Sequence, residues 1–283
     1  MSLLYKTART LAMPACLYPF LRRGTGAEYG IGPAAKLKLV RRFARNAREI
    51  TSATGWHEHL ALATYLLSLP KSMPGVVIEC GCFKGSSTAS LSLVCKAIGR
   101  RLVVCDSFEG LPEVTEHDRV HVSLVAERYE TYAKGDYTGR IEEVKANVAR
   151  YGAIECCSFV KGYFEDTLPN LQEQAAFVFL DVDLHDSLRT CLMNLWPRLQ
   201  DGAYLFTHEA NQLPFASIFF DSAWWNANLQ CAAPGLVGAG CGLPTGPASG
   251  SGLGFTVKLP HDFDPTTDHR FKHFLGDPTG TPP

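Results

Sequence analysis

Residues 75–87 decide the fold, and they read Gly-Val-Val-Ile-Glu-Cys-Gly-Cys-Phe-Lys-Gly-Ser-Ser. The first six form a short apolar, β-branched run that predicts a buried strand. Gly81 permits a sharp turn, and Gly85-Ser86-Ser87 predicts the start of a helix whose free N–H groups can face an anion. A strand, a glycine turn and a helix in this order are typical of the ligand-binding corner of a doubly wound α/β fold.

Further apolar runs follow, with helical patterns between them. We assign strands to 75–80, 102–106, 157–161, 176–182, 203–207 and 254–259, and helices to about 35–50, 56–69, 86–98, 139–151, 185–199 and 213–228. Apolar strands that alternate with helices predict a parallel sheet covered on both faces. The predicted fold is therefore α/β, Rossmann-like and doubly wound, with a mostly parallel seven-stranded sheet and an N-terminal helical extension.

Ionisable residues gather at the ends of these strands. They are Glu79, Asp106, Asp181 with Asp183, and the pair His208 and Glu209. Ligands of doubly wound sheets bind beyond the carboxyl ends of the strands, so these side chains are expected to surround one site.

The acid before the first glycine narrows the choice of ligand. Glu79 would repel a pyrophosphate, and the dinucleotide pattern GxGxxG is absent, so a nicotinamide-dependent reductase is disfavoured. An acid suits a ligand with an ammonium at that point and a carboxylate at the helix N-terminus, and S-adenosylmethionine presents both. Asp106 is then placed to accept hydrogen bonds from ribose hydroxyls.

Composition and charge limit the class of protein. The 283 residues are 46% apolar and 19% charged, as in folded globular proteins. The net charge of −1 hides a division, because residues 1–50 hold ten basic and two acidic side chains. We interpret this basic segment as a cap or dimer-forming element over an acidic cleft. Contact with a membrane surface is the less favoured alternative, and nucleic acid is not expected as a partner.

The ten cysteines include several within apolar runs, such as Cys105 in Val-Val-Cys-Asp. Free thiols packed as small hydrophobes predict a reducing compartment, so we expect a cytoplasmic protein. The longest early apolar stretch, 11–21, is interrupted by Pro14 and Pro19 and is too short to span a membrane.

Four sequence blocks carry a resemblance to a known family. They are Val-Ile-Glu-Cys-Gly at 77–81, Asp-Ser-Phe-Glu-Gly-Leu-Pro at 106–112, Val-Lys-Gly-Tyr-Phe-Glu-Asp-Thr-Leu-Pro at 160–169 and Leu-Asp-Val-Asp-Leu at 180–184. In this order, over about residues 76–209, they resemble the macrocin O-methyltransferase family. Its members are S-adenosylmethionine-dependent enzymes that methylate sugar hydroxyls of natural products.

The resemblance implies roles for individual residues. The methionine end of the cofactor would be held by Glu79, Cys80, Gly81, Phe83, Lys84, Gly85, Ser86 and Ser87. The ribose and adenine would lie at Asp106, Ser107, Phe108, Gly162, Tyr163 and Phe164. Asp181, beside the cofactor, would help to bind magnesium, and Asp183 would act as the general base.

The sequence departs from the family at the next strand end. Thr207-His208-Glu209 stands where the family has two consecutive aspartates that complete the magnesium site. Asp181, His208 and Glu209 are the candidate metal ligands, and an imidazole would favour Mn²⁺, Fe²⁺ or Zn²⁺ over Mg²⁺. Two alternatives stay open: the metal is lost and His208 serves as the base, or His208 only hydrogen-bonds Asp183 in a structural network.

We divide the chain into an N-terminal helical cap at 1–70, an S-adenosylmethionine-binding methyltransferase domain at 71–262 and a surface tail at 263–283. His57 and His59, on the upstream helix, are expected to be ordinary exposed residues. Residues 234–254 hold eight glycines and no hydrophobic period, which predicts a mobile loop and a candidate lid.

The sequence therefore predicts metal-assisted O-methylation of a hydroxyl on a sugar or another natural product. The chain would bind this small-molecule acceptor as a homodimer or a higher oligomer. Two alternatives remain: a catechol-like acceptor, or an altered homologue that binds the cofactor without catalysis.

Overall fold

The computed structural model describes residues 13–115, 118, 120–123, 128–245 and 251–260. Its centre is a six-stranded sheet with the order β5-β2-β1-β6-β7-β8. The strands are β1 (Val76–Cys80), β2 (Leu102–Asp106), β5 (Cys157–Lys161), β6 (Ala175–Leu180), β7 (Leu199–Thr207) and β8 (Gly254–Val257). All neighbours pair in parallel except β7 and β8. The predicted mostly parallel sheet is confirmed, with six strands in the described part of the chain where seven were expected.

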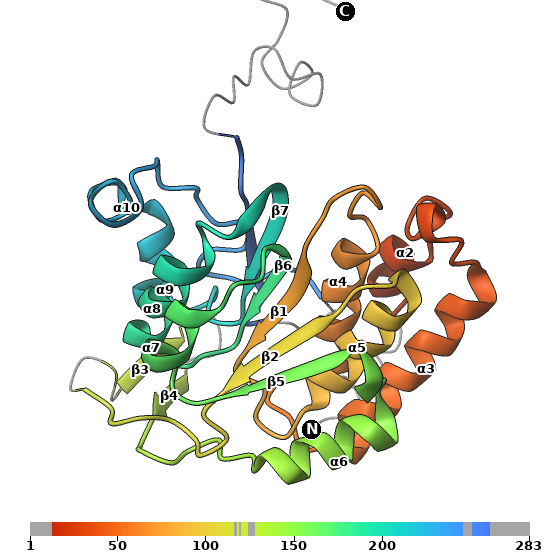
Figure 1. The fold of residues 1–283 in the computed structure, drawn as a ribbon, viewed down its shortest axis with the longest axis horizontal. Coiled ribbons are helices and arrows are strands. Elements are labelled where there is room, and N and C mark those ends of the chain that lie inside the picture. Colours follow the sequence, from red (N-terminus) through yellow and green to blue (C-terminus); the bar gives the residue numbers. More distant parts are fainter. Residues whose placement is uncertain (1–12, 116–117, 119, 124–127, 246–250, 261–283) are drawn as a thin grey trace, which may run out of the picture.

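Helices cover both faces of this sheet (Figure 1). One face carries α2 (Met13–Leu21), α3 (Pro33–Glu49), α4 (Trp56–Leu66), α5 (Ser86–Ile98) and α6 (Ile141–Tyr151). The other carries α7 (Phe164–Thr167), α8 (His185–Leu195), α9 (Leu213–Ala216) and α10 (Ser222–Leu229). Short 3-10 turns lie at Ala27–Tyr29, Ile154–Cys156, Leu168–Asn170 and Ser217–Phe220.

Alternation along the strands divides the interior into two cores. On β1, Val77 packs among the helices α2 to α6, whereas Ile78 and Cys80 pack toward α8 and α9. Neighbouring side chains of a strand point to opposite faces, so a strand buried on both sides must be apolar at nearly every position. Glu79 stands on the Val77 face and is the polar exception.

The N-terminal helices share the first of these cores with the sheet. Phe20, Leu39 and Phe43 are buried in the same cluster as Val77 and the apolar side of α5. The boundary of the cap at residue 70 remains a prediction. The basic residues Lys6 and Arg9, like the tail at 263–283, lie outside the described residues. Within those residues, no helix is both long and apolar enough to cross a membrane.

Several predicted boundaries were wrong for local reasons. The single helix expected at 213–228 is divided into α9, a 3-10 turn and α10, because the Asp221 carboxylate accepts from the Trp224 amide and starts a new helix there. Helix α8 ends at Leu195, before Pro197. A two-stranded hairpin of β3 (Val120–Ser123) and β4 (Arg128–Thr131) was not predicted at all.

The glycine-rich segment is more ordered than the sequence suggested. Val237 pairs with Phe255 of β8, and Leu236 and Leu243 are buried. Residues 246–250 lie outside the described part, so the lid movement stays a prediction. The described residues on either side of them pack against the protein core.

Candidate active site

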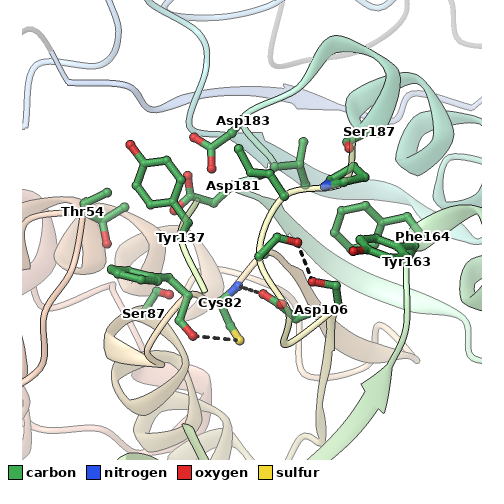
Figure 2. A pocket seen from close by; sticks show the side chains of 18 of the residues that line it. Thr54, Cys82, Ser87, Asp106, Tyr137, Tyr163, Phe164, Asp181, Asp183 and Ser187 are labelled. Atoms are coloured by element: carbon green, nitrogen blue, oxygen red, sulfur yellow. Dashed lines mark hydrogen bonds between the residues drawn. The ribbon is translucent and has the colours of Figure 1, made fainter. Parts of the chain in front are cut away.

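A pocket that is partly open to solvent lies at the carboxyl ends of β1, β2 and β6. Figure 2 shows Asp181 and Asp183 close together in its wall, apart from Asp106, Tyr163 and Phe164. The structure brings these predicted residues into one wall: Gly81, Phe83, Ser87, Asp106, Ser107, Tyr163, Phe164, Asp181 and Asp183. The convergence of strand ends expected from the sequence is therefore present.

The turn after β1 runs close to the neighbouring strand. Gly81 has φ +82°, and a Cβ built on it would lie 1.8 Å from the carbonyl oxygen of Asp181. Phe83 also has a positive φ, of 46°, and Gly85 is the left-handed N-cap of α5. Ser86 and Ser87 therefore occupy the first turn of the helix and do not cap it. The tight turn leaves the backbone at Gly81 open to a ligand.

Asp106 joins this turn to the end of β2. Its two carboxylate oxygens accept from the Cys82 and Phe108 amides, each at 2.7 Å (Figure 2 shows the first of these contacts). Burial raises the pKa of the Asp106 carboxyl, and these backbone hydrogen bonds oppose the rise. Each oxygen of a carboxylate has a second lone pair, so Asp106 can still accept from a ligand hydroxyl.

Glu79 lies behind the pocket wall and is fully buried. Neither carboxyl oxygen has a hydrogen-bond partner of good geometry, although the Ser87 and Thr88 hydroxyls are near. Burial raises the pKa of Glu79 to about 8, despite the opposing effect of these hydroxyls. A buried carboxyl without partners is costly, and a nearby cationic ligand would stabilise its ionised form.

The Asp-x-Asp motif follows β6. Asp183 adopts φ +59°, a conformation that non-glycine residues seldom occupy and that is often found at functional sites. The amides of Val182 and Asp183 both donate to Glu209 Oε1, at 2.7 and 3.1 Å. The other oxygen of Glu209 accepts from the Thr207 hydroxyl. Glu209 therefore anchors the backbone of the motif.

His208 lies between two carboxylates. Its Nδ1 is 3.1 Å from Asp181 Oδ1, and its Nε2 is 3.2 Å from Glu58 Oε1. Burial by itself would lower the pKa of His208, but Asp181 and Glu58 raise it well above its ordinary value. Burial would raise the pKa of Glu58, and the charge and hydrogen bond of His208 instead bring it down to about 2.

The predicted metal site does not fit this donor set. A metal needs a free lone pair on each ligand, yet both nitrogens of His208 face carboxylates, and Glu209 Oε1 already accepts two backbone hydrogen bonds. No group of three acidic, histidine or cysteine residues within the described part of the chain is arranged to hold a metal ion. The ligand set of Asp181, His208 and Glu209 therefore stays a prediction that this arrangement of donors does not favour. His208 bonds Asp181 and Glu58.

Besides Glu79, four predicted cofactor residues have side chains outside the pocket wall. Cys80 is buried in the core on the α8 face, and Phe108 packs against Phe159 in the other core. The Lys84 amine lies 3.2 Å from the Glu143 carboxylate on α6, and the Ser86 hydroxyl is buried in the first turn of α5. Gly85 and Gly162 shape the turns beside the pocket, the latter with its amide bonded to the Asp106 carbonyl.

Sequence reasoning missed several residues of the site. His59 is buried, not exposed, and its ring contacts the Thr54 and Ser90 hydroxyls. Glu58 lies in helix α4, and Ser251 lies in the glycine-rich segment. Nothing in the local sequence pattern distinguishes either residue from its neighbours. Further polar residues of the wall are Thr51, Ser52, Thr54, Tyr137 and Ser187. The Gly55-x-x-Glu58 capping contact is the one local signal, and it marks a helix start only.

The comparison with known families agrees with this site. Residues 65–221, more than half of the chain, match the sequence profile described as Macrocin-O-methyltransferase (TylF). The chain belongs to the macrocin O-methyltransferase family. The match contains the β1 turn, Asp106, the Asp-x-Asp motif and His208, whereas Glu58 and Ser251 lie outside it.

Two curated O-methyltransferases are similar to about half of the chain. The chain is 37% identical over 142 residues to 8-demethyl-8-(2,3-dimethoxy-alpha-L-rhamnosyl)-tetracenomycin-C 4'-O-methyltransferase of Streptomyces olivaceus, covering 48% of this chain and 53% of that protein. It is 28% identical over 143 residues to Mycinamicin III 3''-O-methyltransferase of Micromonospora griseorubida, covering 48% and 56%. The matches span about half the length of each relative.

A solved structure extends the likeness of the fold. The O-methyltransferase NovP superposes with a TM-score of 0.58 at 19% identity, covering 79% of this chain and 98% of NovP. At this identity the likeness shows the fold. The predicted membership of the macrocin O-methyltransferase family and the predicted doubly wound fold are both confirmed.

Proposed function

We propose that this chain transfers a methyl group from S-adenosylmethionine to a hydroxyl of a sugar carried by a natural product. One observation carries the proposal: a single pocket wall holds both the β1 turn with Asp106 and the carboxylates Asp181 and Asp183. The names of both curated relatives specify O-methylation, and the first specifies a rhamnosyl compound, which supports the choice of a sugar acceptor.

The residues present fit S-adenosylmethionine. Gly81 and Ser87 line the pocket, so the backbone of the turn and the first amides of α5 can reach an anionic group there. Asp106 has lone pairs for ribose hydroxyls. Glu79 has unpaired oxygens whose negative charge suits an ammonium group nearby. Tyr163 and Phe164 add aromatic surface at the end of the pocket near Asp106, where an adenine ring can pack.

The bound cofactor supplies a methyl group already activated on a sulfonium. The protein then has to align an acceptor oxygen with the S–CH₃ bond and to remove the hydroxyl proton. We assign the proton to the Asp183 carboxylate, which lies in the wall beside Asp181 and is held by the Glu209 contact to its amide. Asp181 accepts a hydrogen bond from the acceptor or the cofactor and fixes its position.

The acceptor end of the pocket favours a polyhydroxylated compound. Thr51, Ser52 and Thr54 form a polar edge that precedes α4, and Tyr137 faces the same space. Hydroxyl groups can both donate and accept hydrogen bonds, so they can pair with the hydroxyl groups of a sugar in either direction. A catechol, with a flat apolar ring and two hydroxyls, would use fewer of these hydrogen-bonding groups.

The test has two stages. Isothermal titration of S-adenosylhomocysteine into the purified chain should show saturable binding, and its absence would overturn the proposal. Methyl transfer from labelled S-adenosylmethionine is then measured over a panel of rhamnosylated and other glycosylated natural products, with catechols as the comparison. Transfer to catechols alone would contradict the sugar acceptor and keep the cofactor.

A further inference from the structure

We infer that the His208 ring is the cation between the Asp181 and Glu58 carboxylates, so that methyl transfer by this chain needs no divalent metal. Glu58 is a positioning residue that acts through His208. This inference rests on the proposed function for the reaction, while the arrangement of the three side chains is independent of it. The resemblance of the sequence led instead to the expectation of a divalent metal at Asp181, His208 and Glu209, with loss of the metal as an open alternative.

The first step is the geometry of the bridge. His208 follows β7, Asp181 follows β6, and Glu58 belongs to α4, so three separate elements meet at one imidazole ring. The nitrogen-to-oxygen distances are 3.1 Å to Asp181 and 3.2 Å to Glu58, and each of the three side chains is at most 19% exposed. Such partly enclosed pairs are screened less by solvent than surface ion pairs.

The second step is the direction of the hydrogen bonds. An ionised carboxylate can only accept, so an imidazole that bonds one carboxylate through each nitrogen has to donate from both. Glu58 is held as an acceptor by its other contacts: the Gly55 amide and the Ser251 hydroxyl donate to it, each at 2.7 Å. The ring therefore carries a hydrogen on each nitrogen and a positive charge, and it has no lone pair for a metal.

The third step is that the surroundings fix the ring in this place. A Cβ on Gly252 would lie 2.0 Å from the His208 carbonyl oxygen and 2.8 Å from its ring, so the glycine-rich segment lies directly against the histidine. The Ala210 amide donates to the Gly252 carbonyl at 2.8 Å and ties this segment to the residues after β7. A movement of the ring that opened a metal site would collide with this backbone.

The consequence for the reaction concerns Asp181. This carboxylate lines the pocket, and one of its oxygens is bound by the His208 ring. Glu58 orients the ring through the second nitrogen and never reaches the pocket wall. Glu58 thus acts on the pocket through His208 and Asp181, and the positive ring offsets part of the negative charge of Asp181, Asp183 and Glu209.

Cation titration tests the absence of a metal. The full chain is dialysed against EDTA, and Mg²⁺ and Mn²⁺ are titrated calorimetrically into the wild type and into His208→Asp. We expect no saturable binding to the wild type, and saturable binding with a rise in Tm for His208→Asp, because that change replaces a cation by a hard oxygen ligand. Saturable binding to the wild type that is lost in His208→Gln would make His208 a ligand and overturn the inference.

Nuclear magnetic resonance of the ring tests the role of Glu58. In the ¹⁵N-histidine-labelled wild type, both ring nitrogens of His208, assigned by their loss in His208→Gln, should carry a hydrogen. Glu58→Gln should remove or shift the signal of Nε2 and leave that of Nδ1, and the matched surface change Glu155→Gln should leave both. A wild-type ring with one bare nitrogen would overturn the inference.

Binding of S-adenosylhomocysteine is measured on the same samples to separate the two proposals. Glu58→Gln should weaken it by about tenfold or less, since Glu58 does not line the pocket and the loss of one charged hydrogen bond is expected to act indirectly. A wild type that binds no S-adenosylhomocysteine but shows the doubly protonated ring overturns the proposed function and leaves the bridge standing.

Discussion

Gly81 and Asp181 touch through their backbones at the point where β1 and β6 leave the sheet. A Cβ at Gly81 would be 1.8 Å from the Asp181 carbonyl oxygen, which no rearrangement of a side chain could relieve. The turn after β1 and the Asp-x-Asp motif are thus held at a fixed distance from each other. This contact sets the shape of the pocket between them.

Gly81→Ala should therefore destabilise the chain far more than Gly99→Ala does. Both glycines have a positive φ, +82° and +71°, so both substitutions carry the left-handed strain of about 1–2 kcal/mol. Gly99 has no atom within 4 Å of the added Cβ, whereas Gly81 has the carbonyl. We expect at least about 2 kcal/mol of further loss at Gly81, measured by urea unfolding. Equal losses for the two variants would show that the contact is unimportant.

Glu79→Gln should stabilise the cofactor-free chain at neutral and alkaline pH. The pKa of Glu79 is raised from 4.5 to about 8 by burial, so between these values the unfolded chain releases a proton that the folded chain keeps. Stability of the wild type consequently falls as pH rises through this window, by about 3 kcal/mol at pH 7 as an upper value. Glutamine cannot ionise and avoids this loss.

The measurement is the free energy of unfolding at about pH 5 and about pH 8, with Glu155→Gln as the exposed control. The advantage of Glu79→Gln should widen toward the higher pH and be absent in the control. The same variant should bind S-adenosylhomocysteine more weakly, because an amide no longer attracts the ammonium group in this buried region. Tighter or unchanged binding would remove Glu79 from the cofactor site.

Asp183→Asn should separate catalysis from folding. Asparagine adopts the left-handed conformation as readily as aspartate, so the backbone at φ +59° can be kept. Loss of the proton acceptor should lower methyl transfer by about 10²–10⁴-fold, with the affinity for S-adenosylhomocysteine nearly unchanged. Asp201→Asn, an exposed change near the opposite end of β7, is the control. Full turnover by Asp183→Asn would assign the base to another group.

His59 should make the chain lose stability in mild acid. Burial lowers the pKa of His59 from 6.5 to about 4, although Glu58 and Asp181 oppose this effect. Between these values the unfolded chain binds a proton that the folded chain refuses, so stability decreases as pH falls from 6.5 toward 4. His59→Gln should reduce the slope of the unfolding free energy against pH in this window, by an amount that corresponds to at most one bound proton per molecule. Above pH 7 the slope for the variant should equal that for the wild type.

The sequence was sufficient for the central sheet and for the acidic strand ends of the pocket wall. Strands such as 102–106 are apolar at nearly every position because both faces are covered, and their acidic ends converge because parallel strands share a direction. Asp106, Asp181 and Asp183 were found in this way, and the structure places all three in one wall. These sequence signals are local, and the rule that ligands bind beyond the carboxyl ends of parallel strands connects them.

The bridge at His208 could not be found by the same reasoning. Glu58 is 150 residues from His208, and helix α4 reads as an ordinary packed helix whose glutamate caps its own N-terminus. The contact depends on how α4 docks on the sheet, which no local period encodes. The ligand set implied by the resemblance likewise took no account of the hydrogen-bond partners of His208 and Glu209.

The contacts of Glu58 and Ser251 also set a limit for enzyme engineering. The stretch shared with the family, 65–221, contains His208 but neither Glu58 nor Ser251. Glu58 bonds Nε2 of the His208 ring, and Ser251 donates to Glu58. A chimera that transplanted this stretch into a relative would carry the imidazole and Asp181 but not Glu58. Helix α4 and the segment around Gly252 would have to be transferred with the sheet to keep the bridge intact.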